Sequence, residues 1–453
     1  MDLATIETLM REKSIEFVRF EQPDLHGISR NKTVPARNFR YFVERGGLNF
    51  YGGTLGMDAG AGVAMGTGYG EEIGYGDHCV RPDLETFATV PWARNTARVL
   101  CDPYFYDGRP AMAGPRLLVK KLLGELEEMG YLHQSSFEYE FYIVDAQTRK
   151  PVYDGIQIFA TLRTSFDEDF LHRIEREMYA IGIDVITLNA EYGPGQMEIN
   201  YKPALGIGAS DQSFTFKNGV KEIALQHGYM VSFMSKPFIE HSGSGCHYHE
   251  SLLDKETGRN VFYDPDSPDG LSDLCRYYIG GQLAHAPAIC ALANSTVNCY
   301  KRIKKHSFAA YNISWGYENK TVAIRIKGWR GESTHTENRI PGGASNPYLV
   351  QAACLAAGMD GIRNRIEPPP PTEGVAYDRD EIPVLPLSLE EALDALEKDE
   401  VMMAALGEEF TKLYLAVKRH EVEKARRNIE FYGTQQFRTQ VDPWELAEFF
   451  EFL

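Results

Sequence analysis

The chain carries acidic and histidine residues at spacings that aim two side chains in one direction. Glu138 and Glu140 lie two positions apart in the segment 136–144, whose aromatic and aliphatic residues predict a strand. Alternate residues of a strand face the same side, so the two carboxylates are expected to converge. His247 and His249 form a second pair of this kind, after the flexible run Gly-Ser-Gly. The spacing therefore predicts a cluster of metal-binding or acid–base groups.

Four further charged residues extend this pattern. Glu191 and Glu198 stand on either side of a Gly-Pro-Gly turn, and Glu337 precedes Arg339 by two positions. A lone pair of glutamates is more often solvated. Here the pairs lie in apolar strands, where burial without cations would cost several kcal/mol for each carboxylate. Divalent metals offset that cost, and a ligand set of oxygens with one histidine favours Mg²⁺ or Mn²⁺ over Zn²⁺.

A basic segment provides the complementary charge. Between residues 301 and 330 there are eight lysines and arginines against one acid, Glu318, in a chain whose formal net charge is -17. A solvated basic surface is the plain alternative. The functional interpretation is a site for a polyanion such as nucleotide phosphates, facing the metals. The cations are Lys301, Arg302, Lys304, Lys305, Lys320, Arg325, Lys327 and Arg330.

Composition excludes several classes of protein. The 453 residues are 43% hydrophobic and 25% charged, which is typical of a globular protein rather than a disordered one. The acidic net charge argues against nucleic acid or acidic membrane as the main partner. No apolar run reaches about 18 residues, and residues 1–13 predict a surface helix rather than a signal peptide. Seven scattered cysteines without a CxxC pair predict free thiols and a cytoplasmic location.

The elements that must position these residues divide into two regions. Residues 14–20 and 97–101 predict strands, and between them the glycine-rich stretch 46–76 predicts a long ordered loop. It lacks the lysine of a P-loop and the pattern of a dinucleotide fingerprint, and no serine-hydrolase or zincin motif occurs elsewhere. The expected fold is α+β, with a small N-terminal β domain at 1–107 and a large α+β domain at 108–453.

The C-terminal quarter predicts helices. A loop at 367–380 contains four consecutive prolines, and Ser388 with Glu391 has the spacing of a capping box. A helical tail is then expected over 392–428.

Taken together, these motifs resemble the class I type of glutamine synthetase over nearly the full chain. The resemblance implies a small N-terminal β-grasp-like domain and a large α+β catalytic domain. It also implies a double-ringed dodecamer, in which each active site joins one subunit's large domain to the neighbour's N-terminal loop. The matching runs are 23–32, 137–141, 191–198, 243–251, 294–302, 324–326 and 346–348.

The resemblance also implies the chemistry. ATP would phosphorylate the γ-carboxylate of glutamate, and an amine would then attack the γ-glutamyl phosphate. One metal would be held by Glu140, Glu191 and Glu198, and a second by Glu138, His247 and Glu337. The remaining implied roles are glutamate binding by Gly243, Arg302 and Arg339 beside Glu140 and His247, nucleotide binding by His249, Ser251, Arg325 and His335, and phosphoryl transfer assisted by Arg302, Lys320 and Arg325.

Two departures from the family pattern concern the nucleophile. Tyr51 stands where glutamine-forming members keep an aspartate in the N-terminal loop, and Phe308 stands where they keep a flap glutamate. In the family those two carboxylates bind ammonium and take its proton. An aromatic pair instead suits an alkylated amine, whose cation it attracts by about 0.5–2 kcal/mol. The chain thus resembles the γ-glutamylamine ligases, such as γ-glutamylmethylamide synthetase, and methylamine is the first amine predicted.

Several alternatives stay open at this level. The chain could form glutamine from ammonia, or be a γ-glutamylpolyamine or γ-glutamylethanolamide synthetase. A shift of one or two residues in the loops would misplace Tyr51 and Phe308, and a non-catalytic relative could keep the fold. Ser242, Lys320 and His335 also depart from the family pattern, and no replacement base for the amine proton is evident. No tyrosine precedes the run 385–386 in the way that adenylylated members require, so no such control is predicted.

Overall fold

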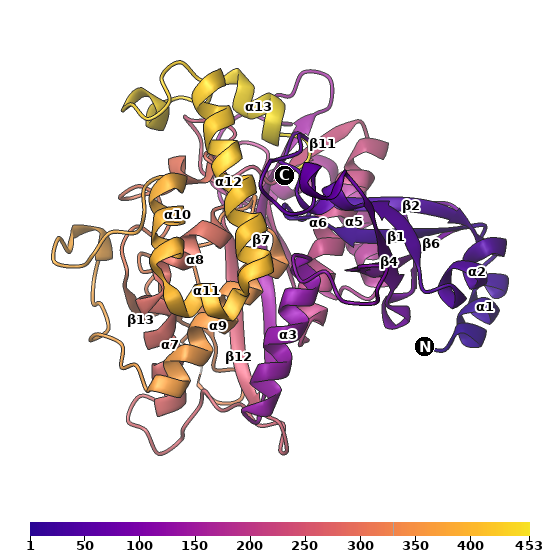
Figure 1. The fold of residues 1–453 in the computed structure, drawn as a ribbon. Helices are drawn as coiled ribbons and strands as arrows, with labels where there is room; N and C mark the ends of the chain where they lie inside the picture. Colours follow the sequence, from indigo (N-terminus) through magenta and orange to yellow (C-terminus); the bar gives the residue numbers. More distant parts are fainter. Residues whose placement is uncertain (329) are drawn as a thin grey trace.

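The structure is a computed structural model that describes residues 1–328 and 330–453. It contains two β-sheets, one N-terminal and one in the large region, which lie side by side in Figure 1. Helix α12 lies across the large region in the same view. Among the described residues, no helix combines the length and the hydropathy needed to cross a bilayer. All seven cysteines are free thiols, as predicted, and six of them are buried.

The N-terminal sheet has six strands in the order β2-β1-β6-β4-β3, with β5 paired to β6. Its core is a separate apolar cluster that includes Ile6, Phe20, Phe39 and Val99. The expected N-terminal helix is present, and the two predicted strands correspond to β1 and β6. The elements are α1 (Leu3–Glu12), β1 (Phe17–Pro23), β2 (Ser29–Pro35), α2 (Phe39–Glu44), β3 (Leu48–Tyr51), β4 (Asp77–Pro82), β5 (Ala88–Thr89) and β6 (Thr96–Tyr104).

The glycine-rich stretch is a long loop that begins with β3 and contains two short 3₁₀ turns, Gly52–Leu55 and Glu71–Ile73. It packs on the C-terminal helix α12 (Glu408–Asn428). The backbone N–H of Ala59 donates to Glu421 at 3.1 Å, and Lys424 forms an ion pair with Asp58 at 2.9 Å. These contacts tie the loop to the large region of the same chain.

The second sheet has nine strands in the order β13-β14-β15-β12-β7-β9-β8, with β10 and β11 also paired to β7. The central strands β7 and β12 run antiparallel along nine residue pairs. The strands are β7 (Tyr131–Asp145), β8 (Val185–Ala190), β9 (Gln196–Tyr201), β10 (Ala204–Leu205), β11 (Tyr229–Ser232), β12 (Cys246–Asp254), β13 (Trp315–Tyr317), β14 (Ile324–Ile326) and β15 (Thr336–Asn338).

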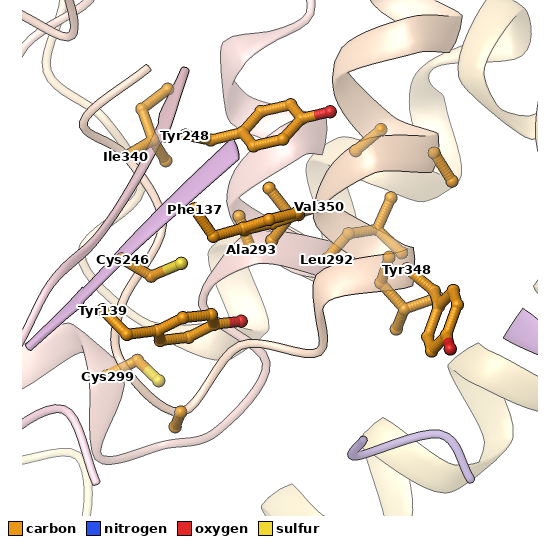
Figure 2. Packing of buried hydrophobic residues seen from close by; sticks show 14 of the residues in the cluster. Phe137, Tyr139, Cys246, Tyr248, Leu292, Ala293, Cys299, Ile340, Tyr348 and Val350 are labelled. Carbon is orange, nitrogen blue, oxygen red and sulfur yellow. The ribbon is translucent and has the colours of Figure 1, made fainter. Parts of the chain in front are cut away.

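Helices cover one face of this sheet. Phe137 and Tyr139 of β7 and Tyr248 of β12 point toward the helices that carry Leu292 and Tyr348 (Figure 2). The rings of Phe137 and Tyr248 lie 4.5 Å apart. The helices of this region are α3 (Pro115–Glu128), α4 (Thr161–Thr164), α5 (Glu168–Ala180), α6 (Gly208–Gln226), α7 (Asp273–Ala284), α8 (Ala286–Ala293) and α9 (Pro347–Asn364).

The predicted helical tail is present but broken into three helices. These are α10 (Leu389–Lys398), α11 (Glu400–Leu406) and α12, and α13 (Pro443–Phe449) follows. Gly407 separates α11 from α12 with φ +85°, a conformation that glycine adopts at little cost. Ser388 caps α10 by accepting from the N–H of Glu391, but the Glu391 carboxylate accepts from Leu387. Only half of the predicted capping box therefore forms.

Candidate active site

The uncovered face of the large sheet collects the charged residues. Strand alternation sends Phe137 and Tyr139 into the core, and it therefore sends Glu138 and Glu140 to the opposite face. In the ladder, Glu138 lies opposite His247, and Glu140 lies opposite Glu198. Strand register thus brings together residues that lie up to about 110 positions apart in the chain.

One group of three side chains can hold a metal ion. Glu138 Oε1 lies 2.8 Å and Glu337 Oε1 lies 3.6 Å from Nδ1 of His247. Each of the three residues offers one ligand atom, and these three atoms all lie within 4.8 Å of one another. The same three residues make up one of the two metal sites that the sequence predicts, and their role as ligands remains a prediction.

A second group lies beside the first and contains Glu140, Glu198 and again His247. Glu140 Oε2 accepts from the backbone N–H of Gly245 at 2.7 Å, which fixes one of its oxygens. Glu191, the third member of the predicted site, lines the same cavity but is outside this set of close ligand atoms. The structure therefore places His247 between the two groups.

Mutual repulsion and burial shift the protonation of this cluster. Burial, together with the charge of Glu140, raises the pKa of Glu191 to about 8. Burial and the charges of Glu138 and Glu140 raise the pKa of Glu198 to about 10. Burial also acts on Glu138, but hydrogen bonds from His247 and His249 hold its pKa well below its usual value. A cluster of carboxylates with one imidazole, partly protonated when empty, fits a hard divalent cation such as Mg²⁺ or Mn²⁺.

We expect metal binding to release protons and to strengthen as pH rises. The raised pKa values mean that Glu191 and Glu198 hold protons at pH 7, which a metal must displace. Calorimetric titration with Mn²⁺ or Mg²⁺ in two buffers of different ionisation enthalpy measures this release directly. Replacing Glu198 with glutamine should reduce the number of protons released. Equal heats in the two buffers, or an affinity independent of pH between about 6 and 8, would contradict the assignment.

The cluster opens into a cavity of about 620 Å³. Sixteen residues have a metal-binding, substrate-binding, nucleotide-binding or catalytic role predicted from the sequence, and twelve of them line this cavity. They come from the large sheet and the segments beside it. They are Glu138, Glu140, Glu191, Glu198, Gly243, His247, Arg302, Phe308, Lys320, Arg325, Glu337 and Arg339.

A second cavity, of about 420 Å³, adjoins the first because both are lined by Glu138. It contains His249, Ser251 and His335, three of the four residues predicted to bind ATP. The rings of His249 and His335 lie 5.3 Å apart. Burial and the neighbouring His249 lower the pKa of His335 to about 4, so His335 is neutral at pH 7. The fourth residue, Arg325, lies in the first cavity, on the far side of Glu138.

Most cations of the basic segment line this site. Five of its eight cations line the first cavity, namely Arg302, Lys304, Lys320, Arg325 and Lys327. Arg325 Nη1 donates to Glu337 Oε2 at 2.9 Å, and Arg339 pairs with the other oxygen of the same carboxylate. The Nε atoms of Arg325 and Arg339 are buried and have no hydrogen-bond partner among the described residues. The basic segment thus concentrates positive charge at the cavity, where it suits an anionic ligand.

Arg302 is a buried cation of the first cavity. It is only 5% exposed, and its guanidinium donates to the carbonyl oxygens of Ile340 and Arg339 at 3.3 and 3.5 Å. No carboxylate forms an ion pair with it among the described residues, and burial lowers its pKa. A Cβ on Gly245 would lie 2.7 Å from Arg302 Nη2, so glycine is required for this close approach. A buried guanidinium without a carboxylate is suited to bind the carboxylate of a ligand.

Tyr51 and Phe308, the two aromatic residues that depart from the family pattern, lie in different places. Tyr51 is on β3, opposite Asp77, with its ring over Gly53, and it lines neither cavity within one chain. The predicted approach of Tyr51 to a neighbouring subunit's site stays a prediction. Phe308 lines the first cavity, is 51% exposed, and has a ring that stacks on Tyr192.

Several residues of this cavity were not singled out in the sequence. They include Tyr192, Lys236, Glu240 and an apolar group from one loop, Ile156, Ile158 and Phe159. Tyr192 directly follows Glu191, but the turn residues around it gave no reason to assign the ring a role. The loop near 156–159 shows no strand or helix period, so its approach to the site could only come from the tertiary structure.

The chain is similar to known proteins over nearly its full length. Residues 112–437 match the family described as glutamine synthetase, catalytic domain. The glutamine synthetase of Thermotoga maritima is 35% identical over 463 residues, 99% of each chain. The glutamate–isopropylamine ligase of a Pseudomonas species is 33% identical over 461 residues, 99% of this chain and 98% of that protein. A solved GmaS complex with ADP superposes with a TM-score of 0.84 at 29% identity, covering 97% of this chain and 98% of that one.

The chain has the fold of an ATP-dependent ligase and is an enzyme of that class. It belongs to the glutamine synthetase family, which confirms the resemblance found in its sequence. The α+β fold, with a small N-terminal region and a large catalytic region, is confirmed by the same matches.

Proposed function

We propose that this protein joins the γ-carboxylate of L-glutamate to a small alkylamine, with ATP converted to ADP and phosphate. The observation that carries this proposal is Phe308, an aromatic ring in the cavity on a loop beside Arg339. A ring there offers apolar contact to an alkyl group and gives ammonium no acceptor. The similarity to an isopropylamine ligase over 99% of the chain supports the same class of substrate. Methylamine is the smallest amine of this class.

The substrates are assigned by charge. Arg302, buried and without a carboxylate partner, binds a carboxylate of glutamate, with Arg339 beside it. The second cavity takes the nucleoside between His249, His335 and Ser251. The phosphates then extend past Glu138, which borders both cavities, toward Arg325 in the first one. Mg²⁺ or Mn²⁺, held by the two groups around His247, would neutralise phosphate charge.

The protein's own part in the reaction is positioning and electrostatics. An oxygen of the glutamate γ-carboxylate attacks the γ-phosphorus of ATP, and ADP leaves. Arg325 stabilises the charge on the transferring phosphoryl group from its place against Glu337, and Lys320 adds a further cation. The amine nitrogen then attacks the acyl carbon, phosphate leaves with the C–O bonding electrons, and the nitrogen loses one proton. We also propose that the chain works as a ring-shaped homo-oligomer, in which a neighbour's loop brings Tyr51 to this site.

The test is ADP release with glutamate, ATP and Mg²⁺ across ammonia, methylamine, ethylamine, ethanolamine and putrescine. We expect kcat/KM for a short alkylamine to exceed that for ammonia by about 10-fold or more, since the pocket binds the alkyl group in addition to the nitrogen. Glutamate without an amine should give little ADP. Equal or better use of ammonia would identify a glutamine synthetase instead, and a preference for putrescine or ethanolamine would point to the polyamine or ethanolamide branch.

A further inference from the structure

Two aromatic rings meet at the edge of the active-site cavity. Tyr192 and Phe308 stack with centroids 5.8 Å apart and ring planes 14° from parallel. Both rings are partly open, at 42% and 51% exposure, and both line the cavity. They come from segments more than 100 positions apart, so the stack is a product of the tertiary fold. Partly open aromatic faces beside a cluster of metal-binding carboxylates form an apolar surface where a charged substrate must pass.

The backbone holds Phe308 in place on the cavity rim. His306 and Phe308 both have φ +57°, which is uncommon for residues other than glycine. The carbonyl of Phe308 accepts from Arg339 Nη2 at 3.1 Å, and the next carbonyl, that of Ala309, accepts from the Tyr377 hydroxyl at 3.1 Å. These bonds offset the cost of the strained backbone and keep the ring in the cavity.

The backbone of Tyr192 is fixed as firmly. The N–H of the following Gly193 donates to Gln196 Oε1 at 2.8 Å within the tight turn. A Cβ on Gly193 would lie 2.1 Å from the hydroxyl oxygen of Tyr142, so the turn is packed directly against that ring. Tyr192 thus projects from a rigid turn, and it lies next to Glu191 at the metal cluster.

The apolar side chains of the cavity are few beside its charged ones. Outside the metal cluster its only carboxylate among the described residues is Glu240, and its cations repel an ammonium group. Among the described residues, its apolar side chains are the two stacked rings, Ala309 and the loop residues Ile156, Ile158 and Phe159. An apolar substituent is therefore expected to bind at this wall, with the nitrogen directed toward the carboxylates.

We propose that Tyr192 is a specificity-determining residue, which with Phe308 forms an aromatic slot, a shallow surface along the open edges of the two stacked rings, that binds the alkyl part of the amine. The slot selects amines by the length of the alkyl chain and disfavours ammonia. This inference rests on the proposed function, because it names the part of the site that recognises the amine. The plain alternative is that the stack only holds the Phe308 loop and touches no substrate.

The experiment measures kcat/KM for ammonia, hydroxylamine, methylamine, ethylamine and n-propylamine. In the unmodified protein we expect about a fourfold rise for each added methylene that the slot covers. In Tyr192→Ala the rise should fall to about twofold or less per methylene, so that the loss grows with chain length and is smallest for ammonia and hydroxylamine. Tyr192→Phe keeps the ring and should restore the chain-length dependence. Tyr179→Ala removes an exposed tyrosine on α5, away from the cavity, and should leave the whole profile unchanged.

The outcomes distinguish a stack that binds the amine from one that only holds the loop. They also distinguish a failure of this inference from a failure of the proposed function. A Tyr192→Ala variant that loses the same factor with every nucleophile would show that the stack only positions the loop, and would overturn the slot. A chain-length profile that is identical in Tyr192→Ala and the unmodified protein would also overturn it while leaving the alkylamine ligase intact. If the unmodified protein prefers ammonia to every alkylamine, the proposed function itself fails.

Discussion

Replacing Arg302 with methionine is expected to abolish turnover while raising the melting temperature of the ligand-free protein. The guanidinium is buried, and it contacts only carbonyl oxygens at 3.3 and 3.5 Å. Burial of this charge destabilises the fold. Glu140 attracts it but forms no ion pair with it among the described residues, so an apolar side chain of similar length in its place should raise the free energy of unfolding. The same charge is proposed to bind the glutamate carboxylate, so kcat/KM for glutamate should fall by about 100-fold or more. Function is here maintained at the expense of stability.

Two further variants make this prediction sharper. Arg302→Lys keeps the charge but loses the two-pronged geometry, so glutamate KM should rise by about 10-fold or more while ATP binding is retained. Arg276→Met is the matched control, because Arg276 already pairs with Asp269 at 2.6 Å outside the cavity, and its loss should not raise the melting temperature. A thermal shift assay and steady-state kinetics are sufficient. A lower melting temperature for Arg302→Met with normal glutamate KM would contradict the carboxylate-binding role.

The second large effect concerns Arg325. It donates to Glu337 at 2.9 Å and also pairs with Glu318, which places its guanidinium beside the carboxylate cluster and on the proposed path of the phosphates. An arginine that stabilises a transferring phosphoryl group contributes a factor of about 1,000 or more to kcat. Arg325→Ala should therefore reduce kcat by about that factor with only a small change in the KM for the amine. The kcat of Arg325→Lys should lie between those of the unmodified protein and Arg325→Ala, since lysine keeps the charge but lacks the forked guanidinium.

The control for Arg325 is a nearby arginine with another task. Arg330 lies five residues on, and its Nε donates to the carbonyl of Asp269 at 3.0 Å. Arg330→Lys should leave kcat within about twofold of the unmodified protein, as is usual away from the reacting atoms. If the kcat of Arg325→Ala stays within about 10-fold of the unmodified protein, phosphoryl transfer does not depend on this side chain and its assigned role is wrong.

The local features of this fold were predictable from the sequence, because they depend on short-range periodicity. The alternation that sends Glu138 to one face and Phe137 to the other is visible within nine residues. The break at Gly407 was missed, because the polar and apolar residues on either side keep a helical period. Only the residue's left-handed backbone conformation separates the two helices.

The site was predictable as a set of residues but not as a geometry. The register that places His247 opposite Glu138, and so between two groups of carboxylates, depends on pairing across about 110 residues. The Tyr192–Phe308 stack depends on a strained loop that packs back onto the sheet, and nothing in either local sequence indicates the contact. Tyr51 marks the limit of a single chain, because it lines neither of the two cavities described for the site. Its assignment depends on an assembly of several chains.

The central claim is that the protein activates glutamate as an acyl phosphate and transfers it to an alkylamine. The most direct measurement uses glutamate labelled with ¹⁸O in the γ-carboxylate, with ATP, Mg²⁺ and methylamine or ethylamine, followed by mass spectrometry of both products. Attack of the labelled carboxylate on ATP predicts one ¹⁸O atom in each phosphate released and a γ-glutamyl alkylamide as the organic product. Unlabelled phosphate, or glutamine from trace ammonia as the only amide formed, would contradict the account.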